Sequence, residues 1–109
     1  MLEPLLGSKN RERVLQYLLA RGEGYAKEIA DFYDVALDPI QKQLERLELG
    51  GVLVSRQIGR MRLYSFNPRY AFAEEVKILL ERAREFYPPE ERERLVMGRK
   101  RPRRKGKPL

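Results

Sequence analysis

Apolar residues recur at helical spacing over residues 8–22 and predict an amphipathic helix in that segment. Ser8 is a favourable N-cap residue, and Gly22 suits the position directly after a last helical turn. The residues that share the apolar side are Val14, Leu15, Leu18 and Leu19. A shorter helix with inward-facing apolar residues fits residues 25–33. Two helices are therefore predicted in the first third of the chain.

A third helix is predicted after a connector of residues 34–37, and its start carries the clearest signal in the chain. Asp38 can cap the helix, Pro39 suits its first position, and Gln41 completes a capping box with Asp38. The buried stripe and the end of this helix are marked by Ile40, Leu44, Leu47, Gly50 and Gly51. The connector is short enough for the second and third helices to form a helix-turn-helix.

The exposed side of this third helix carries charges of both signs. At 100° per residue, four residues lie within about 40° of the side opposite the apolar stripe, and two more flank them. The four are Asp38, Lys42, Glu45 and Leu49, and the flanking two are Gln41 and Arg46. Residues 38–48 carry a net charge of −1, so this helix is expected to bind DNA phosphates only weakly in a nonspecific manner. Carboxylates can accept a hydrogen bond from cytosine N4, so the face still permits base-specific contacts.

A β-hairpin is predicted after the third helix. Residues 52–56 and 61–66 are rich in β-forming residues, and a turn that contains Gly59 separates them. Three arginines cluster around this turn, namely Arg56, Arg60 and Arg62, and no acidic residue lies between Ser55 and Asn67. The cluster indicates a surface that faces an anion.

A long helix is predicted over residues 71–87, and two prolines at positions 88 and 89 would end it. Its apolar stripe consists of Phe72, Val76, Leu79, Leu80 and Ala83. The stripe can pack against its own domain or against a second copy of the chain, and we expect it to form a homodimer interface. Residues 90–97 can add one or two further helical turns.

The charge of the 109-residue chain is concentrated at one end. The net charge is +7, and residues 99–107 hold seven basic and no acidic residues, so the basic and acidic groups of residues 1–98 cancel. The composition of residues 98–109 predicts a disordered basic tail. Such a tail raises the affinity for any polyanion with little sequence discrimination, or serves only as a solubilising end.

The composition excludes several functional classes. The chain has no cysteine and no histidine, so it lacks thiolate nucleophiles, the usual zinc ligands and the commonest general base. It contains no P-loop, dinucleotide-binding or nucleophile-elbow motif. We therefore expect a non-enzyme without catalytic residues, cofactor or metal site. No apolar run is long enough to cross a bilayer and no signal peptide is recognisable, so we expect a cytoplasmic protein without membrane contact.

The order of these elements predicts a fold that is mainly α with a β-hairpin wing. It is a winged helix-turn-helix with an additional long C-terminal helix. We expect a DNA-binding domain at residues 1–68, a dimerisation helix at residues 69–97 and the tail at residues 98–109.

Residues 5–68 also resemble winged helix-turn-helix transcriptional regulators of the ArsR/MarR-like superfamily. The matching features are Leu6-Gly7-Ser8-Lys9 with Arg11, Ile29-Ala30 after Glu28, Ile40–Leu44 with Leu47 and Gly51, and Arg56–Tyr64 before Asn67-Pro68. The metal-sensing branch of that superfamily uses cysteine and histidine ligands, so the resemblance here is to regulators that do not sense metals. It implies a small bacterial or archaeal regulator of transcription.

Together these features favour a transcriptional regulator that binds double-stranded DNA as a homodimer. The third helix would enter the major groove, and the wing would contact the flanking backbone or the minor groove. The expected DNA-binding residues are Asp38, Pro39, Gln41, Lys42, Glu45, Arg46, Arg56, Arg60 and Arg62. The alternative is a winged-helix module that binds a protein or RNA, which the acidic third helix favours. A small-molecule effector is a third possibility, with Tyr17, Tyr70 and Phe72 as aromatic candidates and no effector identified.

Overall fold

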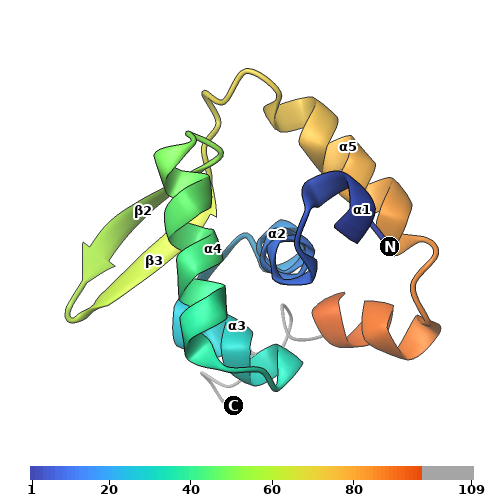
Figure 1. Cartoon of the computed structure of the whole chain (residues 1–109), viewed down its shortest axis with the longest axis horizontal. Coiled ribbons are helices and arrows are strands. Elements are labelled where there is room, and N and C mark those ends of the chain that lie inside the picture. The colour runs from blue at the N-terminus through green and yellow to red at the C-terminus, as the bar shows by residue number, and fades with distance from the viewer. Residues whose placement is uncertain (97–109) are drawn as a thin grey trace, which may run out of the picture.

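The longer helices and the hairpin follow one another along the chain in the order that the hydrophobic pattern predicts. The computed structural model describes residues 1–96 (Figure 1). Its elements are α1 (Glu3–Leu6), α2 (Lys9–Arg21), β1 (Glu23–Tyr25), α3 (Ala26–Tyr33), α4 (Leu37–Leu49), β2 (Leu53–Ile58), β3 (Met61–Phe66) and α5 (Ala73–Arg84). A further helical segment covers residues 89–96. The predicted tail lies outside the described residues.

The three strands form one antiparallel sheet in the order β1-β3-β2. Ile58 pairs with Met61 at the end of the hairpin, so the turn has two residues rather than the predicted four. Gly59 has a φ of 60° and takes the first position of this turn, which requires a positive φ. The wing is therefore longer and its turn tighter than the sequence predicted, because residues 57 and 58 continue the strand.

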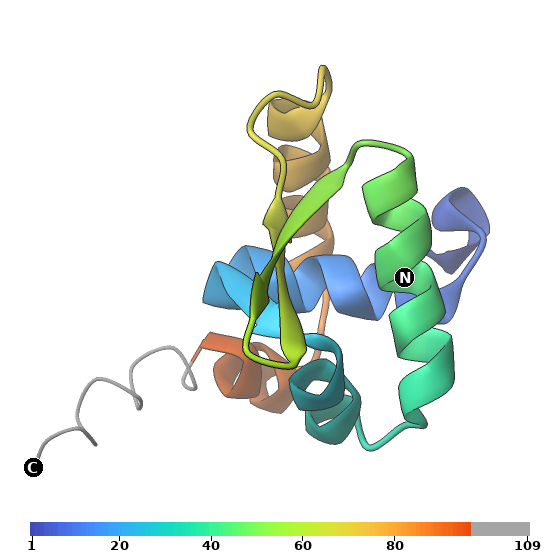
Figure 2. The same ribbon diagram turned by 90° about the vertical axis from the view of Figure 1, so that its left-hand side faces the viewer.

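The hydrophobic core is built around α2, which crosses the middle of the molecule behind the sheet (Figure 2). The largest fully buried apolar residues come from α2, α3, α4, β2, α5 and the segment 89–96: Val14, Tyr17, Leu18, Ile29, Ile40, Leu44, Leu53, Leu80 and Leu95. Because Leu80 and Leu95 join the same cluster, α5 and the segment 89–96 pack onto the winged-helix core. Their buried apolar area adds to the stability of that core.

The helix-turn-helix closes at Asp34, which has a left-handed conformation with a φ of 55°. Asp and Asn adopt this region more readily than most other residues, so the position is tolerated without a glycine. The amide of Val35 donates to the carbonyl of Ala30 at 3.0 Å and completes the turn. The predicted tight connection between the second and third helices is confirmed.

The predicted capping box at the start of α4 is wrong. The helix begins at Leu37, its N-cap residue is Ala36, and no side chain caps it. Asp38 therefore lies inside the first turn, where its carboxylate forms an ion pair with Lys42 at 3.3 Å. Pro39 also lies in this turn, where the missing amide costs nothing because these amides have no partner within the helix.

Two short elements, α1 and β1, are absent from the sequence prediction. α1 is only four residues long and ends at Gly7, which has a φ of 85°. β1 has three residues and pairs with β3 through Gly24 and Tyr64. Neither element is long enough to show a helical or a strand period of apolar residues, so the sequence pattern does not mark them and tertiary contacts define them.

The C-terminal helices differ from the prediction in length. α5 covers Ala73–Arg84 rather than residues 71–87, and the predicted helical turns before residue 97 are confirmed over residues 89–96. Arg21 holds this last segment, since its Nε donates to the carbonyl of Leu95 at 2.8 Å. Arg94 in turn donates to the carbonyl of Phe32 at 2.8 Å and stacks on its ring at 4.5 Å. These contacts tie the end of the described chain to α2 and α3.

Substitution of Gly24 by alanine is expected to destabilise the fold. A Cβ at this position would lie 2.8 Å from Cε1 of Tyr17, whose ring is buried in the core and has little room to move. Overpacking of this kind costs about 1–3 kcal/mol. Urea denaturation of Gly24→Ala should show that loss of unfolding free energy. Gly50→Ala is the matched control, because its Cβ would come no closer than 3.5 Å to the Arg46 carbonyl, and a similar loss in both variants would contradict the explanation.

Candidate nucleic-acid interface

The exposed side of α4 presents a mixture of amide and charged groups. Gln41, Lys42, Glu45 and Arg46 are all exposed, while Ile40 and Leu44 anchor the opposite side of the helix in the core. α4 packs against α2 and α3, which support it from behind (Figure 1). The helix is therefore held rigidly while a continuous polar face stays open.

Ion pairs within the helices reduce the free positive charge on this side. Lys42 is paired with Asp38, and on α3 Lys27 is paired with Asp31, both at 3.3 Å. All four side chains are largely exposed, so each pair contributes little to stability. Arg46 forms no ion pair with any described residue, which leaves its guanidinium available to an external anion.

The buried side of α4 is fixed by Arg11 from α2. Nε of Arg11 donates to Oε1 of Gln43 at 2.9 Å, and its Nη1 donates to the carbonyl of Leu6 at the same distance. Ser8 caps the beginning of α2 by accepting the amide of Arg11 at 3.1 Å. Arg11 therefore positions α4 relative to α1 and α2, a role that the sequence did not reveal. The polar Gln43 on an otherwise apolar side was the available signal.

The three wing arginines have three different environments. Arg56 lies 3.8 Å from the carboxylate of Glu23 on β1, so the prediction that no acid balances this cluster is wrong. Nη1 of Arg62 donates to Oγ of Ser55 at 2.9 Å. Arg60 sits in the exposed turn and has no ion pair within residues 1–96. Arg60 is therefore the wing cation most open to an external phosphate.

Ser55 links the wing to α4. Its hydroxyl donates to Oε2 of Glu48 at 2.6 Å and accepts from Arg62. The chain of Glu48, Ser55 and Arg62 joins the end of α4 to both long strands. Hydrogen bonds that involve charged groups are stronger than neutral ones, so this chain helps to set the angle of the wing relative to α4.

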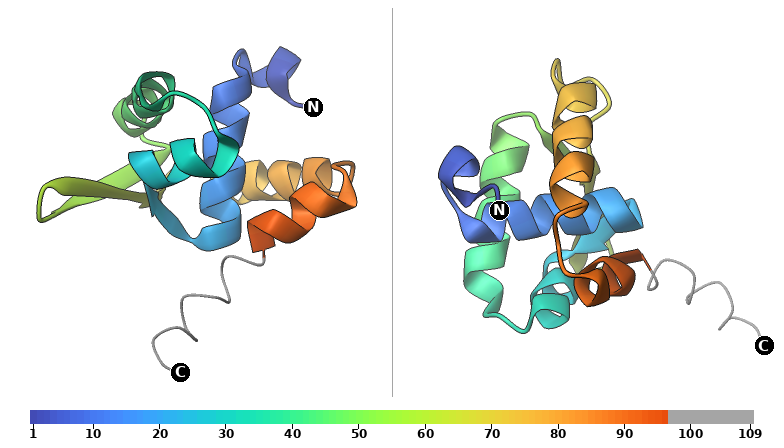
Figure 3. Two further views of the ribbon diagram at one scale, coloured as in Figure 1. Left: turned by 90° about the horizontal axis from the view of Figure 1, so that it is seen from below. Right: turned by 90° about the vertical axis from the view of Figure 1, so that its right-hand side faces the viewer.

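A groove of about 400 Å³ lies between α4 and the wing. Four of the predicted binding residues line it, namely Gln41, Glu45, Arg60 and Arg62. Tyr64 lies at its base, and burial together with the nearby Glu48 and Glu45 carboxylates raises the pKa of Tyr64. Arg56 lies outside the groove, because alternate residues of β2 point to opposite faces of the sheet. Figure 3 shows the wing projecting from the body beside α4.

The predicted dimer stripe on α5 is divided between two faces. Leu80 and Ala83 are buried in the chain's own core, so the expectation that these two face a partner is corrected, and Val76 is half-buried against the same core. Phe72 and Leu79 are 60% and 36% exposed. Phe86, which is not part of the predicted stripe, is 60% exposed. Phe72 is the N-cap residue of α5, Leu79 lies in its middle, and Phe86 lies two residues beyond its last residue, Arg84; we call these three exposed apolar residues the α5 strip.

The described residues contain no group of three or more potential ligands placed to hold a metal ion. Over the same residues, no helix has the length and apolar character needed to cross a bilayer.

Comparisons with known proteins identify the fold. Neither a family model nor a curated protein matches the sequence. Reduced HlyU from Vibrio cholerae superposes with a TM-score of 0.60 at 17% identity, over 79% of this chain and 84% of the other. The fold defined by these helices and this wing is a winged helix-turn-helix, as the sequence predicted.

Two further structures share this architecture. The homodimeric winged helix-turn-helix DNA-binding domain of Mb0332 from Mycobacterium bovis, a possible ArsR-family transcriptional regulator, gives a TM-score of 0.57 at 23% identity, with 77% and 75% of the two chains covered. A mutant of ZitR from Lactococcus lactis in its apo form gives 0.50 at 17% identity, with 83% and 77% covered. The resemblance that the sequence suggested is thus confirmed at the level of the fold.

Proposed function

We propose that this protein is a transcriptional regulator that binds double-stranded DNA as a homodimer. The observation that carries the proposal is the groove between α4 and the wing, where Gln41, Glu45, Arg60 and Arg62 converge on one open surface. The exposed side of α4 would enter the major groove, which is about 12 Å wide and admits a helix. The wing would then contact the flanking backbone or the minor groove. Mb0332, described as a homodimeric DNA-binding domain, supports both parts of the proposal.

The surface suggests a division of roles. Gln41 and Glu45 are exposed and carry groups that can hydrogen-bond to base edges: an amide pairs with adenine, and a carboxylate accepts from cytosine N4. Arg46 and Arg60 lack intramolecular ion pairs among the described residues and suit phosphates. Asp38, Pro39 and Lys42 lie on the first two turns of the same helix, where the Asp38–Lys42 pair must open before Lys42 can contact DNA fully. Arg62 is a positioning residue for the wing.

Gln41→Ala and Arg60→Ala are expected to weaken DNA binding in different ways. Loss of a base contact at Gln41 should cost about 1–3 kcal/mol on a selected duplex and almost nothing on a random duplex. Loss of a phosphate contact at Arg60 should weaken both duplexes similarly and reduce the salt dependence by about one unit of slope. Fluorescence anisotropy over a salt series measures both quantities. Glu93→Ala, an exposed change in the helical segment 89–96, is the control and should bind both duplexes as the native chain does. An equal loss of specificity in Gln41→Ala and Arg60→Ala would contradict these roles.

The second candidate function is a module that binds a protein or RNA. The observation that favours it is the internal pairing of charges on α3 and α4, which leaves this side with little net positive potential. A winged helix of this kind would co-purify with a partner and show no selectivity among duplexes. Selective duplex binding by the purified protein would exclude it.

A further inference from the structure

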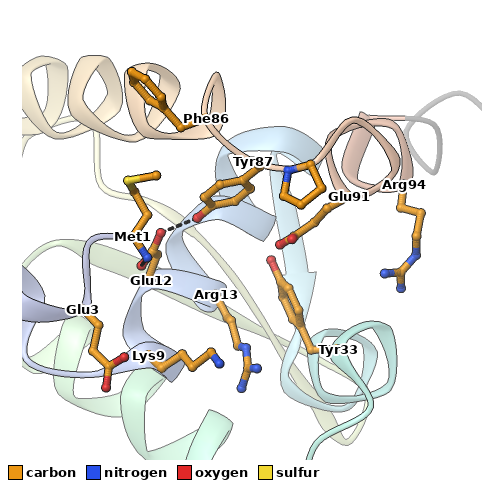
Figure 4. A pocket seen from close by; sticks show the side chains of 11 residues that line it. Met1, Glu3, Lys9, Glu12, Arg13, Tyr33, Phe86, Tyr87, Glu91 and Arg94 are labelled. Atoms are coloured by element: carbon orange, nitrogen blue, oxygen red, sulfur yellow. Dashed lines mark hydrogen bonds and ion pairs between the residues drawn. The ribbon is translucent and has the colours of Figure 1, made fainter.

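A cavity of about 560 Å³ opens on the side of the molecule away from the wing (Figure 4). Its walls come from the N-terminal segment, the first turns of α2, the last residue of α3 and residues 86–94. Its volume is within the range of small-molecule sites. The groove proposed to bind DNA uses none of these residues, so the cavity has no role in that contact.

The charged side chains around the cavity balance in number. They are Lys9, Arg13 and Arg94 on the positive side and Glu3, Glu12 and Glu91 on the negative side. Glu12 is buried and already satisfied, because its Oε1 accepts the amide of Leu2 at 2.7 Å and its Oε2 accepts the hydroxyl of Tyr87. The amino group of Met1 lies 3.4 Å from the same carboxylate. Glu12 therefore organises the wall and is not free to bind an occupant.

Three charged groups remain for an occupant inside the cavity. Lys9 and Glu91 form no ion pair or hydrogen bond through their side chains with the described part of the chain. Arg13 uses one nitrogen, since its Nη1 donates to Oδ1 of Asn10 at 2.9 Å. Glu3 is exposed at the rim, and Arg94 donates to the carbonyl of Phe32. One wall thus offers two cations and the other a carboxylate, as Figure 4 shows for Arg13, Lys9 and Glu91.

Aromatic rings supply the apolar part of the lining. Tyr33 and Tyr87 are both half-buried, and Phe86 lies largely exposed at the mouth. Burial and the neighbouring Glu91 carboxylate raise the pKa of Tyr33, so its phenol stays neutral and can donate a hydrogen bond. Aromatic rings pack against one another in edge or offset contact, so these side chains suit a ligand with a ring and add to the area buried.

The three free groups include both signs of charge, and this mixture favours one class of ligand. A simple anion would meet the carboxylate of Glu91, and a simple cation would meet Lys9 and Arg13. A zwitterion can place each of its charges against the opposite charge, and opposite charges attract more strongly in a partly buried site than in water.

We propose that this cavity binds a small zwitterion with an aromatic ring, which is the chemistry of a free aromatic amino acid. The carboxylate of the ligand pairs with Lys9 and Arg13, its ammonium group pairs with Glu91, and its ring packs beside Tyr33 and Tyr87.

The cavity is connected to the helix-turn-helix through Tyr33. This residue is the last of α3 and directly precedes Asp34, the left-handed residue of the turn before α4. The guanidinium of Arg13 lies 5.6 Å from the centroid of the Tyr33 ring, so a ligand that engages Arg13 also changes the surroundings of that ring. Occupancy of the cavity therefore regulates the orientation of α4, an effect on DNA affinity that rests on the proposed function.

Isothermal titration calorimetry of the full chain tests the binding without DNA. L-phenylalanine, L-tyrosine and L-tryptophan are the probes, and at least one should bind saturably with a Kd below about 1 mM. N-acetyl-L-phenylalanine, L-phenylalanine amide and L-alanine each lack one recognition element, and we expect each to bind at least about tenfold more weakly than L-phenylalanine. The proposal is overturned if none of the three amino acids binds, or if the blocked derivatives bind equally well.

Substitutions in the lining test the placement of the ligand. Glu91→Gln and Arg13→Gln should each weaken binding of the best probe at least about tenfold, with unchanged circular dichroism spectra. Glu90→Gln, an exposed neighbour outside the lining, is the matched control and should bind as the native chain does. Native affinity in both lining variants would overturn the site.

A second assay separates regulation from DNA binding itself. A saturating probe should change the Kd for a selected duplex at least about threefold, and an unchanged Kd contradicts the regulatory role. Failure of the protein to bind any duplex contradicts the proposed function and leaves the calorimetric result standing.

Discussion

Removal of residues 99–109 is expected to lower the affinity for every DNA duplex by about 10²-fold near 0.15 M salt. This segment holds seven basic residues, whereas the basic and acidic groups of the rest of the chain cancel. If about half of the seven charges neutralise phosphates, the slope of log K against log salt becomes shallower by about three units. Anisotropy titrations of selected and random duplexes over a salt series measure both effects. The ratio of the two affinities should stay constant, because phosphate contacts carry no sequence information.

A variant of full length separates charge from chain length in this test. Replacement of the seven basic residues by glutamine should reproduce the effect of the truncation. Thermal unfolding should be unchanged in both proteins, since Leu95, the last buried residue of the described chain, is retained. A loss of affinity confined to the selected duplex would show that the tail reads sequence, contrary to this explanation.

Leu79→Glu is expected to convert a homodimer into a monomer and to lower the affinity for a two-fold-related duplex by about 10²-fold. The α5 strip of Phe72, Leu79 and Phe86 is the exposed apolar surface that we propose to be buried between two copies. A carboxylate at its centre would lose much of its hydration when the second copy packs over it, which disfavours the dimer. Loss of the second protein chain also removes one half-site contact from each binding event.

Sedimentation velocity at about 10 μM measures the first effect, and anisotropy with one-site and two-site duplexes measures the second. Glu81→Ala, an exposed change on another side of α5, should leave the dimer intact. Leu80→Ala, in contrast, should lower the stability of the monomer itself by about 2–5 kcal/mol, because this side chain is buried in its own core. A native chain that sediments as a monomer at this concentration would contradict the assignment of the α5 strip.

Much of the fold follows from local signals in the sequence. Ser8 and Gly22 bound α2 as predicted, because capping depends on residues within one turn of the helix end. The start of α4 was misplaced by two residues, since Asp38 resembles a cap but is drawn into an ion pair with Lys42. β1 escaped prediction because three residues show no period, and only pairing with β3 defines it.

The binding surface was less predictable than the fold. The exposed side of α4 follows from helical periodicity alone, so Gln41, Lys42, Glu45 and Arg46 are exposed as expected. The environment of Arg56 depends on Glu23, which is distant in sequence and reaches it only through the sheet. The cavity beside Tyr33 is assembled from four separate segments, and no local pattern in the sequence marks such a site.

Sequence-specific binding by α4 is tested by the ratio of the affinities for selected and scrambled DNA. Duplexes are enriched from a random pool with the full chain, and the best sequence and its scrambled form are then titrated at about 0.15 M salt. We predict a two-fold-related sequence that binds at least about 10³-fold more tightly than its scrambled form, and about 1–3 kcal/mol of that advantage should be lost in Gln41→Ala. Equal affinities for the two duplexes would contradict sequence-specific binding by α4.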